Sequence, residues 1–296
     1  MGSPVRAAVR LVLYLGWTFL LLPVQIAAVA LRLRLARRLP RFYHRICCRL
    51  IGLDVSRHGT IAPSRPILFV SNHTSYLDIT VLGSLLDVSF VAKAEIADWP
   101  LFGLLAKLQR SVFIERRASH SVRHRDEIAT RLADGDALVI FPEGTTGDGN
   151  RVLPFKSALF AVAARTVAGA PLAVQPISIA YVRLDGVPLG REWRPYCAWY
   201  GAMNLPPHLW RLLGLGKIAV EVLFHPPLDI AAAAADAGLP WGNEPDRVTV
   251  AAARKVLAGR CHTIVAQGVS AALSDEIAAG GADVLLSDPL SPGSAA

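Results

Sequence analysis

The chain has 296 residues, of which 53% are hydrophobic and 18% charged, so its composition excludes a disordered or fibrous protein. The formal net charge is +8, but residues 1–50 hold nine arginines and no acid, which leaves 22 basic against 23 acidic residues in 51–296. The positive charge therefore belongs to the N-terminal segment, and this distribution argues against a nucleic-acid-binding domain. The four cysteines show neither metal-ligand spacing nor a disulfide framework, so we expect no metal site.

An uncharged apolar segment runs from Leu11 to Leu31. A helix of this length is about 30 Å long, which matches the hydrocarbon core of a bilayer. The larger of its two flanking arginine clusters follows it, which predicts a protein of the cytoplasmic (inner) membrane whose remaining chain faces the cytoplasm. A cleaved signal peptide, a buried core helix, and a segment kinked or re-entrant at Pro23 are the alternatives.

A second helix is expected to begin near Pro40, because proline suits the first helical turn. An apolar stripe and a basic stripe follow, each with a spacing of four residues: Phe42, Ile46 and Leu50, and Arg41, Arg45 and Arg49. Such a helix can lie on an anionic lipid surface. The alternative is an ordinary helix packed on the rest of the protein. Residues 1–52 are therefore predicted to form a membrane anchor followed by a basic amphipathic helix.

Beyond residue 52, short β-rich segments alternate with helical patterns. The predicted strands are 67–70, 89–92, 111–114, 137–141, 172–179 and 218–224. The predicted helices are 76–86, 100–108, 119–132, 157–165 and 247–273. This alternation predicts an α/β domain over residues 53–274, with a largely parallel or mixed central sheet covered by helices. Residues 275–296, which end in SDPLSPGSAA, are predicted to be a disordered tail.

Ligands of open α/β sheets bind beyond the carboxyl ends of the strands, so the loops there are the places to look for chemistry. His73 and Asp78 follow the first predicted strand; a histidine can act as a general base, and a carboxylate can orient it. The alternative is a helix-capping loop with an incidental histidine. Arg116 follows the third strand and could bind an anion, although a solvated charge cluster is the ordinary explanation.

The fourth predicted strand leads into Phe141-Pro142-Glu143-Gly144-Thr145-Thr146-Gly147-Asp148-Gly149-Asn150. Its glycines can bring backbone N–H groups close to an anion or a polar group. The segment is not a P-loop, since no Lys-Ser/Thr follows the glycines. Lys156 opens the next predicted helix and could meet a phosphate or carboxylate. The alternatives are a plain surface loop and a solvent-exposed lysine.

Together these segments resemble the PlsC-type glycerolipid acyltransferases, the family of 1-acylglycerol-3-phosphate acyltransferases and related lysophospholipid acyltransferases. Asn72-His73 with Asp78 resembles the family's first block, Asn-His-x4-Asp. Val112 to Arg116 resembles the second block, Phe141 to Thr145 matches the third, and Gln175-Pro176-Ile177 resembles the fourth.

The resemblance implies transfer of an acyl group from acyl-CoA or acyl carrier protein to the free hydroxyl of a lysolipid, with no other cofactor. It implies that His73 is the general base, that Asp78 orients it, and that Arg116 binds the phosphate of the acceptor. The remaining implied substrate-binding residues are Glu143, Gly144, Thr145, Lys156 and Pro176. Membrane lipids, the lysolipid acceptor and the acyl donor are thus the implied partners, and residues 53–274 become the acyltransferase domain.

This chain departs from the family pattern at three positions. Thr146 stands where many members that use lysophosphatidic acid have arginine, and Arg110 and Ala158 each stand where glycine is usual. We expect acylation of 1-acyl-sn-glycerol 3-phosphate to phosphatidic acid. The departure at Thr146 supports an alternative, acylation of lyso-ornithine lipid or another lysophospholipid. A non-catalytic membrane-binding relative is the further alternative.

Overall fold

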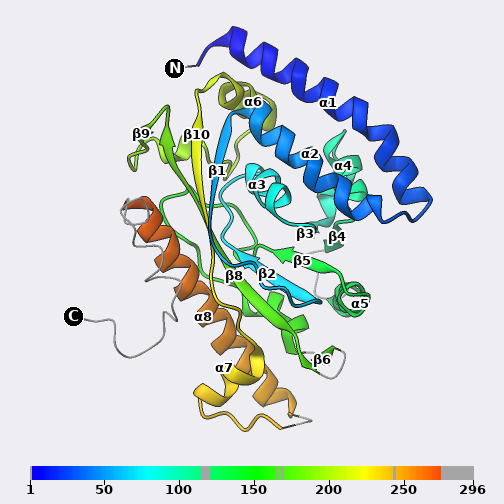
Figure 1. Cartoon of the computed structure of the whole chain (residues 1–296). Coiled ribbons are helices and arrows are strands. Elements are labelled where there is room, and N and C mark those ends of the chain that lie inside the picture. Colours follow the sequence, from blue (N-terminus) through cyan, green and yellow to red (C-terminus); the bar gives the residue numbers. More distant parts are fainter. Residues whose placement is uncertain (1, 115–120, 165, 168–169, 243–244, 275–296) are drawn as a thin grey trace.

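A computed structural model of the chain describes residues 2–114, 121–164, 166–167, 170–242 and 245–274 (Figure 1). Arg116 and the predicted tail 275–296 lie outside these ranges.

The centre of the molecule is a mixed eight-stranded sheet. Along the sheet the strands are β1 (Leu53–Gly59), β10 (Ile218–Phe224), β8 (Ala173–Leu184), β2 (Ile67–Ser71), β5 (Ala137–Ile140), β3 (Ser89–Lys93) and β4 (Val112–Ile114), and β9 (Val187–Pro188) pairs with β8. Neighbouring strands run parallel from β8 to β4, whereas β10 runs antiparallel to β8. The α/β fold with a parallel or mixed sheet is confirmed, and the six predicted strands are all present.

Helices cover both faces of the sheet (Figure 1). The α-helices are α1 (Pro4–Ala30), α2 (Leu35–Ile51), α3 (Leu77–Leu85), α4 (Phe102–Leu108), α5 (Ser121–Ala133), α6 (Leu205–Gly214), α7 (Ile230–Asp236) and α8 (Arg247–Leu273). Three 3₁₀ segments, η1 (Ala94–Asp98), η3 (Ser157–Ala164) and η4 (Arg194–Tyr196), and a small hairpin of β6 (Thr166–Val167) and β7 (Ala170–Pro171) complete the described elements. The predicted helix 157–165 is a 3₁₀ segment over Ser157–Ala164, its described part. Among the longer elements, β1, α6 and α7 were not predicted.

The core is divided by the sheet, because successive side chains of a strand point to opposite faces. Phe69 of β2 and Val139 of β5 are buried against α2, α3 and α6. Leu68 and Leu138, their neighbours in the chain, are buried on the other face with residues of α5, α7, α8 and η3. These continuous apolar strands are typical of a parallel sheet covered on both sides.

The predicted apolar segment is part of α1, which begins at Pro4 and continues without a break through Pro23. Within the described residues, α1 is the one helix whose length and apolar composition would allow it to cross a bilayer, a property that it shares with signal sequences and some core helices. In the structure α1 lies along α2 and α6 (Figure 1), and most of its surface stays exposed.

The second helix begins at Leu35 rather than near Pro40, so Pro40 lies inside α2. A proline there cannot donate a hydrogen bond to the carbonyl four residues earlier, that of Ala36. The side chain of Gln25 in α1 supplies the missing donor, with Nε2 lying 3.1 Å from Ala36 O and 2.8 Å from Leu108 O. The tertiary contact between α1 and α2 therefore allows the helix to extend through the proline.

Candidate active site

Two loops that follow neighbouring parallel strands form the site. The segment after β2 begins with Asn72, and the segment after β5 begins with Phe141. Because Val70 of β2 pairs with Ile140 of β5, the carboxyl ends of both strands lie at the same edge of the sheet. Asn72 ties this edge to β8, since its side chain donates to Ile179 O and accepts from Ile179 N, both at 2.9 Å.

His73 and Asp78 are in direct contact. His73 Nδ1 lies 2.8 Å from Asp78 Oδ2. A carboxylate only accepts hydrogen bonds, so Nδ1 carries the proton and Nε2 is the nitrogen left to accept one. This is the arrangement that a general base needs.

Asp78 is completely buried at the start of α3 and is held by several donors. Besides His73, the backbone N–H groups of Thr74 and Ser75 donate to Oδ2 at 2.7 and 2.9 Å, and the Tyr181 hydroxyl donates to Oδ1 at 2.7 Å. These bonds compensate the carboxylate for its loss of water and fix the direction in which it faces His73.

The imidazole ring of His73 is also fixed from its face. It stacks on Phe141 with ring centroids 4.0 Å apart and an angle of 14° between the planes, and Phe141 in turn lies parallel to Phe90. The carbonyl of His73 accepts a hydrogen bond from the N–H of Gly147, at 2.8 Å. The loop after β5 therefore holds both the backbone and the ring of His73.

Glu143 links the two loops instead of facing an open cavity. Its side chain is 3% exposed, and its oxygens accept hydrogen bonds from His73 N at 2.8 Å and Leu153 N at 3.1 Å. Burial raises the pKa of Glu143 to about 8, although its two backbone hydrogen bonds act in the opposite direction and Asp78 adds a smaller increase. The geometry makes Glu143 a positioning residue for the histidine loop.

The other predicted binding residues occupy distinct places. Gly144 has φ +67°, a backbone conformation that favours glycine, whereas a Cβ there would meet only the movable end of the Lys156 side chain, with Nζ at 2.6 Å. Thr145 and Lys156 are exposed beside it, and Lys156 N donates to Pro142 O. Pro176 lies deeper, buried in β8 opposite Val70 of β2.

Arg110, which stands where the resembled family has glycine, adopts φ +61°. This left-handed conformation costs a non-glycine residue about 1–3 kcal/mol. Its guanidinium pairs with the buried carboxylate of Asp136 at 2.8 Å, an interaction that a glycine could not make. The ion pair offsets the backbone strain.

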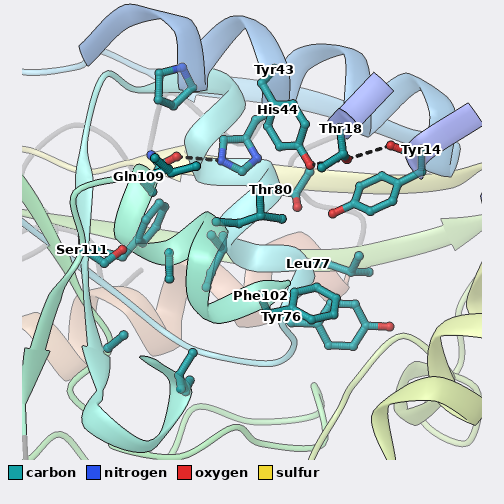
Figure 2. A pocket seen from close by; sticks show the side chains of 18 of the residues that line it. Tyr14, Thr18, Tyr43, His44, Tyr76, Leu77, Thr80, Phe102, Gln109 and Ser111 are labelled. Atoms are coloured by element: carbon teal, nitrogen blue, oxygen red, sulfur yellow. Dashed lines mark hydrogen bonds between the residues drawn. The ribbon is translucent and has the colours of Figure 1, made fainter. Parts of the chain in front are cut away.

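An apolar pocket of about 220 Å³ extends from His73 between the N-terminal helices and α3, α4 and α6 (Figure 2). Figure 2 shows Tyr14, Thr18 and Tyr43 on one side of it and Tyr76 and Phe102 on another. The lining residues that the sequence prediction missed include aromatic and leucine side chains: Tyr76, Trp99, Trp199, Leu205, Leu209 and Leu213. Leu205, Leu209 and Leu213 are spaced four residues apart, and this pattern could have identified an amphipathic helix from the sequence.

The α/β fold and the His73–Asp78 pair beside an apolar pocket are what the resemblance to acyltransferases predicts, and comparison with known proteins establishes the class. A family model described as Acyltransferase matches residues 52–180. The chain is 49% identical to lyso-ornithine lipid O-acyltransferase of Brucella abortus over 72% of this chain and 81% of that protein. It is 34% identical to 1-acyl-sn-glycerol-3-phosphate acyltransferase of Neisseria gonorrhoeae over 59% of this chain and 64% of that protein.

A solved structure supports the fold. The crystal structure of the 1-acyl-sn-glycerophosphate acyltransferase PlsC from Thermotoga maritima superposes with a TM-score of 0.53 at 21% identity, covering 89% of this chain and 96% of that one. The chain belongs to the PlsC-type acyltransferase family.

Proposed function

We propose that this protein moves a fatty acyl group from acyl-CoA or acyl carrier protein to the free hydroxyl of lyso-ornithine lipid. The observation that carries the proposal is the oriented His73–Asp78 pair in the wall of an apolar pocket, in a chain 49% identical to a lyso-ornithine lipid O-acyltransferase. The same pair argues against a non-catalytic membrane-binding relative.

In the proposed reaction, His73 Nε2 accepts the proton of the acceptor hydroxyl while the hydroxyl oxygen attacks the thioester carbonyl. An ester C–O bond forms, the C–S bond breaks, and the departing thiolate takes up a proton. Asp78 stabilises the positive charge that develops on the imidazole. Because a thioester is already activated, one positioned base is sufficient, and the mechanism requires neither a covalent acyl-enzyme nor a metal.

The pocket suits a fatty chain. Its lining comes mainly from apolar and aromatic side chains of α1, α2, α3, α4 and α6, and it includes His73. An acyl chain bound there would be removed from water with its reactive end beside the base, and such burial contributes about 25 cal/mol per Å² of apolar surface.

The two candidate functions differ in the lipid that accepts the acyl group. Lyso-ornithine lipid carries a carboxylate and an ammonium group, whereas 1-acyl-sn-glycerol 3-phosphate carries a phosphate. Thr146, in place of the arginine common among users of lysophosphatidic acid, favours the acceptor without phosphate. A second relative named lyso-ornithine lipid O-acyltransferase, from Rhizobium meliloti, is 46% identical over 76% of this chain and 78% of that protein. The 34% identity to the Neisseria gonorrhoeae enzyme keeps 1-acyl-sn-glycerol 3-phosphate as the second candidate.

We further propose that α1 lies in one leaflet of the cytoplasmic membrane, with the active site on the cytoplasmic side. Hydrogen bonds join α1 to the body at several points along its length: Ser3 N to Gly214 O, Arg10 to Leu215 O, Trp17 to Tyr43 O, and Gln25 to Leu108 O. A helix held along its length by the globular body cannot cross a bilayer alone. Its exposed apolar residues, among them Val12, Phe19 and Leu20, can instead enter the lipid interface beside the basic residues of α2.

Thiol release by the purified full-length protein in mixed micelles tests the function. Acyl-CoA and acyl carrier protein are offered in turn with lyso-ornithine lipid or 1-acyl-sn-glycerol 3-phosphate, and His73→Ala is the control. We expect turnover with lyso-ornithine lipid that falls about 10²–10⁴-fold in His73→Ala. Preference for the phosphate acceptor would overturn the choice of acceptor, and equal activity of the variant would overturn the role of His73.

A further inference from the structure

Arg194 lies beside the catalytic loop but comes from a part of the chain that the family model does not match. It begins η4, between β9 and α6. The segment that carries it packs on the histidine loop, since Trp199 N donates to Thr74 O at 3.0 Å. A Cβ placed on Gly149 would lie 3.2 Å from Thr74 Cγ2 and 3.8 Å from Arg194 Cβ, so the three residues meet at one point.

The guanidinium of Arg194 is anchored through neutral acceptors. Nε donates to Leu189 O at 3.0 Å, and Nη1 donates to Asn150 Oδ1 at 3.2 Å. Asn150 belongs to the loop whose Gly147 holds the carbonyl of His73. The two bonds fix the orientation of the guanidinium, and within the part of the chain that the structure describes its other three N–H groups have no recorded acceptor.

This cation is half-buried, and among the described residues no carboxylate lies within ion-pair distance of it. Burial, followed by the charge of Arg191, lowers the pKa of Arg194. Burying a charge without a partner is unfavourable, and an anionic ligand would remove the penalty. A guanidinium whose remaining N–H groups have no acceptor among the described residues is suited to a planar carboxylate, which it can bind through two parallel hydrogen bonds.

We propose that Arg194 is a specificity-determining residue that binds the acidic group of the acceptor, the carboxylate in the case of lyso-ornithine lipid. This inference rests on the proposed function and names the headgroup contact within it. It also accounts for Thr146: the charge that many relatives place on the loop after β5 is supplied here by the η4 segment, whose Arg194 is hydrogen-bonded to Asn150 of that same loop.

The test compares an acceptor with its methyl ester, which differs only in this group, and with a phosphate-bearing acceptor. Full-length protein is assayed with lyso-ornithine lipid, with its methyl ester, and with 1-acyl-sn-glycerol 3-phosphate. The variants are Arg194→Met, which keeps the length of the side chain, Arg194→Lys, which keeps the charge, and Arg191→Ala, which removes the exposed neighbouring arginine as a matched control.

We expect the wild-type protein to prefer the acid over the ester in kcat/KM. Arg194→Met should reduce this preference at least tenfold through KM, and Arg194→Lys should retain part of it. Arg191→Ala should retain most of it, because Arg191 acts on the site only through its nearby charge. Equal losses on the acid and the ester in both Arg194 variants, or a loss in kcat alone, would show a structural role and overturn the proposal. A wild-type preference for the phosphate acceptor, with a tenfold increase of its KM in Arg194→Met, would keep the anion-binding role while overturning the proposed function.

Discussion

At the scale of single residues, the acidic partner of His73 is held more firmly than the histidine itself. Asp78 has no exposed surface and accepts hydrogen bonds from two backbone N–H groups, from His73 and from Tyr181. Tyr181 is the one of these donors that belongs to β8, so it connects the His73–Asp78 pair to the central sheet.

Replacing Tyr181 by phenylalanine removes this connection and little else. A hydrogen bond to a charged group contributes about 1.5–3 kcal/mol, so we expect a comparable fall in the free energy of unfolding. Turnover should also fall, because Oδ1 of Asp78 then has no donor and the carboxylate is held toward His73 through Oδ2 alone. Chemical denaturation and thiol release measure the two effects. Tyr200→Phe, whose hydroxyl lies outside the described hydrogen-bond network of Asp78, is the matched control; an equal effect there would contradict the expectation.

The raised pKa of Glu143 leads us to expect that the stability of the folded protein depends on pH. Its pKa is raised in the folded protein to about 8, whereas the unfolded chain has the ordinary value of about 4.5. The folded protein therefore holds a proton that the unfolded chain has lost, and stability should fall as the pH rises from about 5 to about 8, by up to about 1.4 kcal/mol per pH unit. Chemical denaturation over this range checks the slope. In Glu143→Gln the slope should be shallower; identical slopes in the two proteins would count against the raised pKa.

At the scale of elements, the N-terminal helices are stabilised by a side chain of one helix that donates hydrogen bonds to backbone carbonyls of its neighbours. Gln25 of α1 donates to Ala36 O, the carbonyl that Pro40 leaves without a donor, and to Leu108 O at the end of α4. A single amide thus joins three helices around the pocket.

A double-mutant cycle tests this compensation. Gln25→Leu leaves both carbonyls without their donor and should lower the free energy of unfolding by about 1–3 kcal/mol for each. In a Pro40→Ala background the residue at 40 regains an N–H that can reach Ala36 O, so the same replacement should cost about 1 kcal/mol less. Additive effects would show that Gln25 does not substitute for the missing donor.

Replacing either of two helical glycines by alanine should change the stability of the protein, but in opposite directions. A Cβ on Gly83 of α3 would lie 2.4 Å from the ring of His44, whereas one on Gly259 of α8 would meet nothing within 4 Å. Gly83→Ala should destabilise the protein by about 1–3 kcal/mol, because the buried ring must move. Gly259→Ala should stabilise it by about 0.5–1 kcal/mol, since alanine favours helix. Thermal unfolding distinguishes the two, and stabilisation by both would show that α2 and α3 separate easily.

At the scale of the whole molecule, α1 has one side that lines the pocket and another whose apolar residues are exposed. Its inner side lines the pocket through Tyr14 and Thr18, while Val12 and Leu20 are exposed. A lipid chain in the pocket and the proposed membrane surface would thus be separated by a single helix, which shortens the path of a substrate from the bilayer to His73.

Val12→Glu tests the membrane surface. Val12 is 68% exposed on α1, and placing a charge there should weaken binding to anionic vesicles by tenfold or more, which corresponds to about 1.4 kcal/mol. Val248→Glu on α8, where Val248 is 78% exposed, is the matched control and should not change binding. Vesicle sedimentation measures both. Unchanged binding of Val12→Glu would place the lipid contact elsewhere.

The sequence alone predicts those features of this protein that depend on local interactions or on periodic patterns of apolar residues. Alternating apolar segments identified six strands and the α/β class, and the position of His73 and Glu143 just after two of them placed both residues at one edge of the sheet. Spacing alone could not show the contact between His73 and Asp78, and it did not indicate that Glu143 turns inward to hold the histidine loop.

The tertiary structure decided what depends on distant segments. Pro40 predicted the start of a helix by local propensity, but the side chain of Gln25 allows α2 to begin at Leu35. Arg194, 121 positions from His73 in the chain, meets the loop that carries His73 only because β8 and the segment after it return to that edge of the sheet. Sequence patterns show which residues favour water and which favour a given backbone conformation. They do not show which distant side chain will pair with a buried donor, acceptor or charge, because that pairing depends on how the whole chain packs.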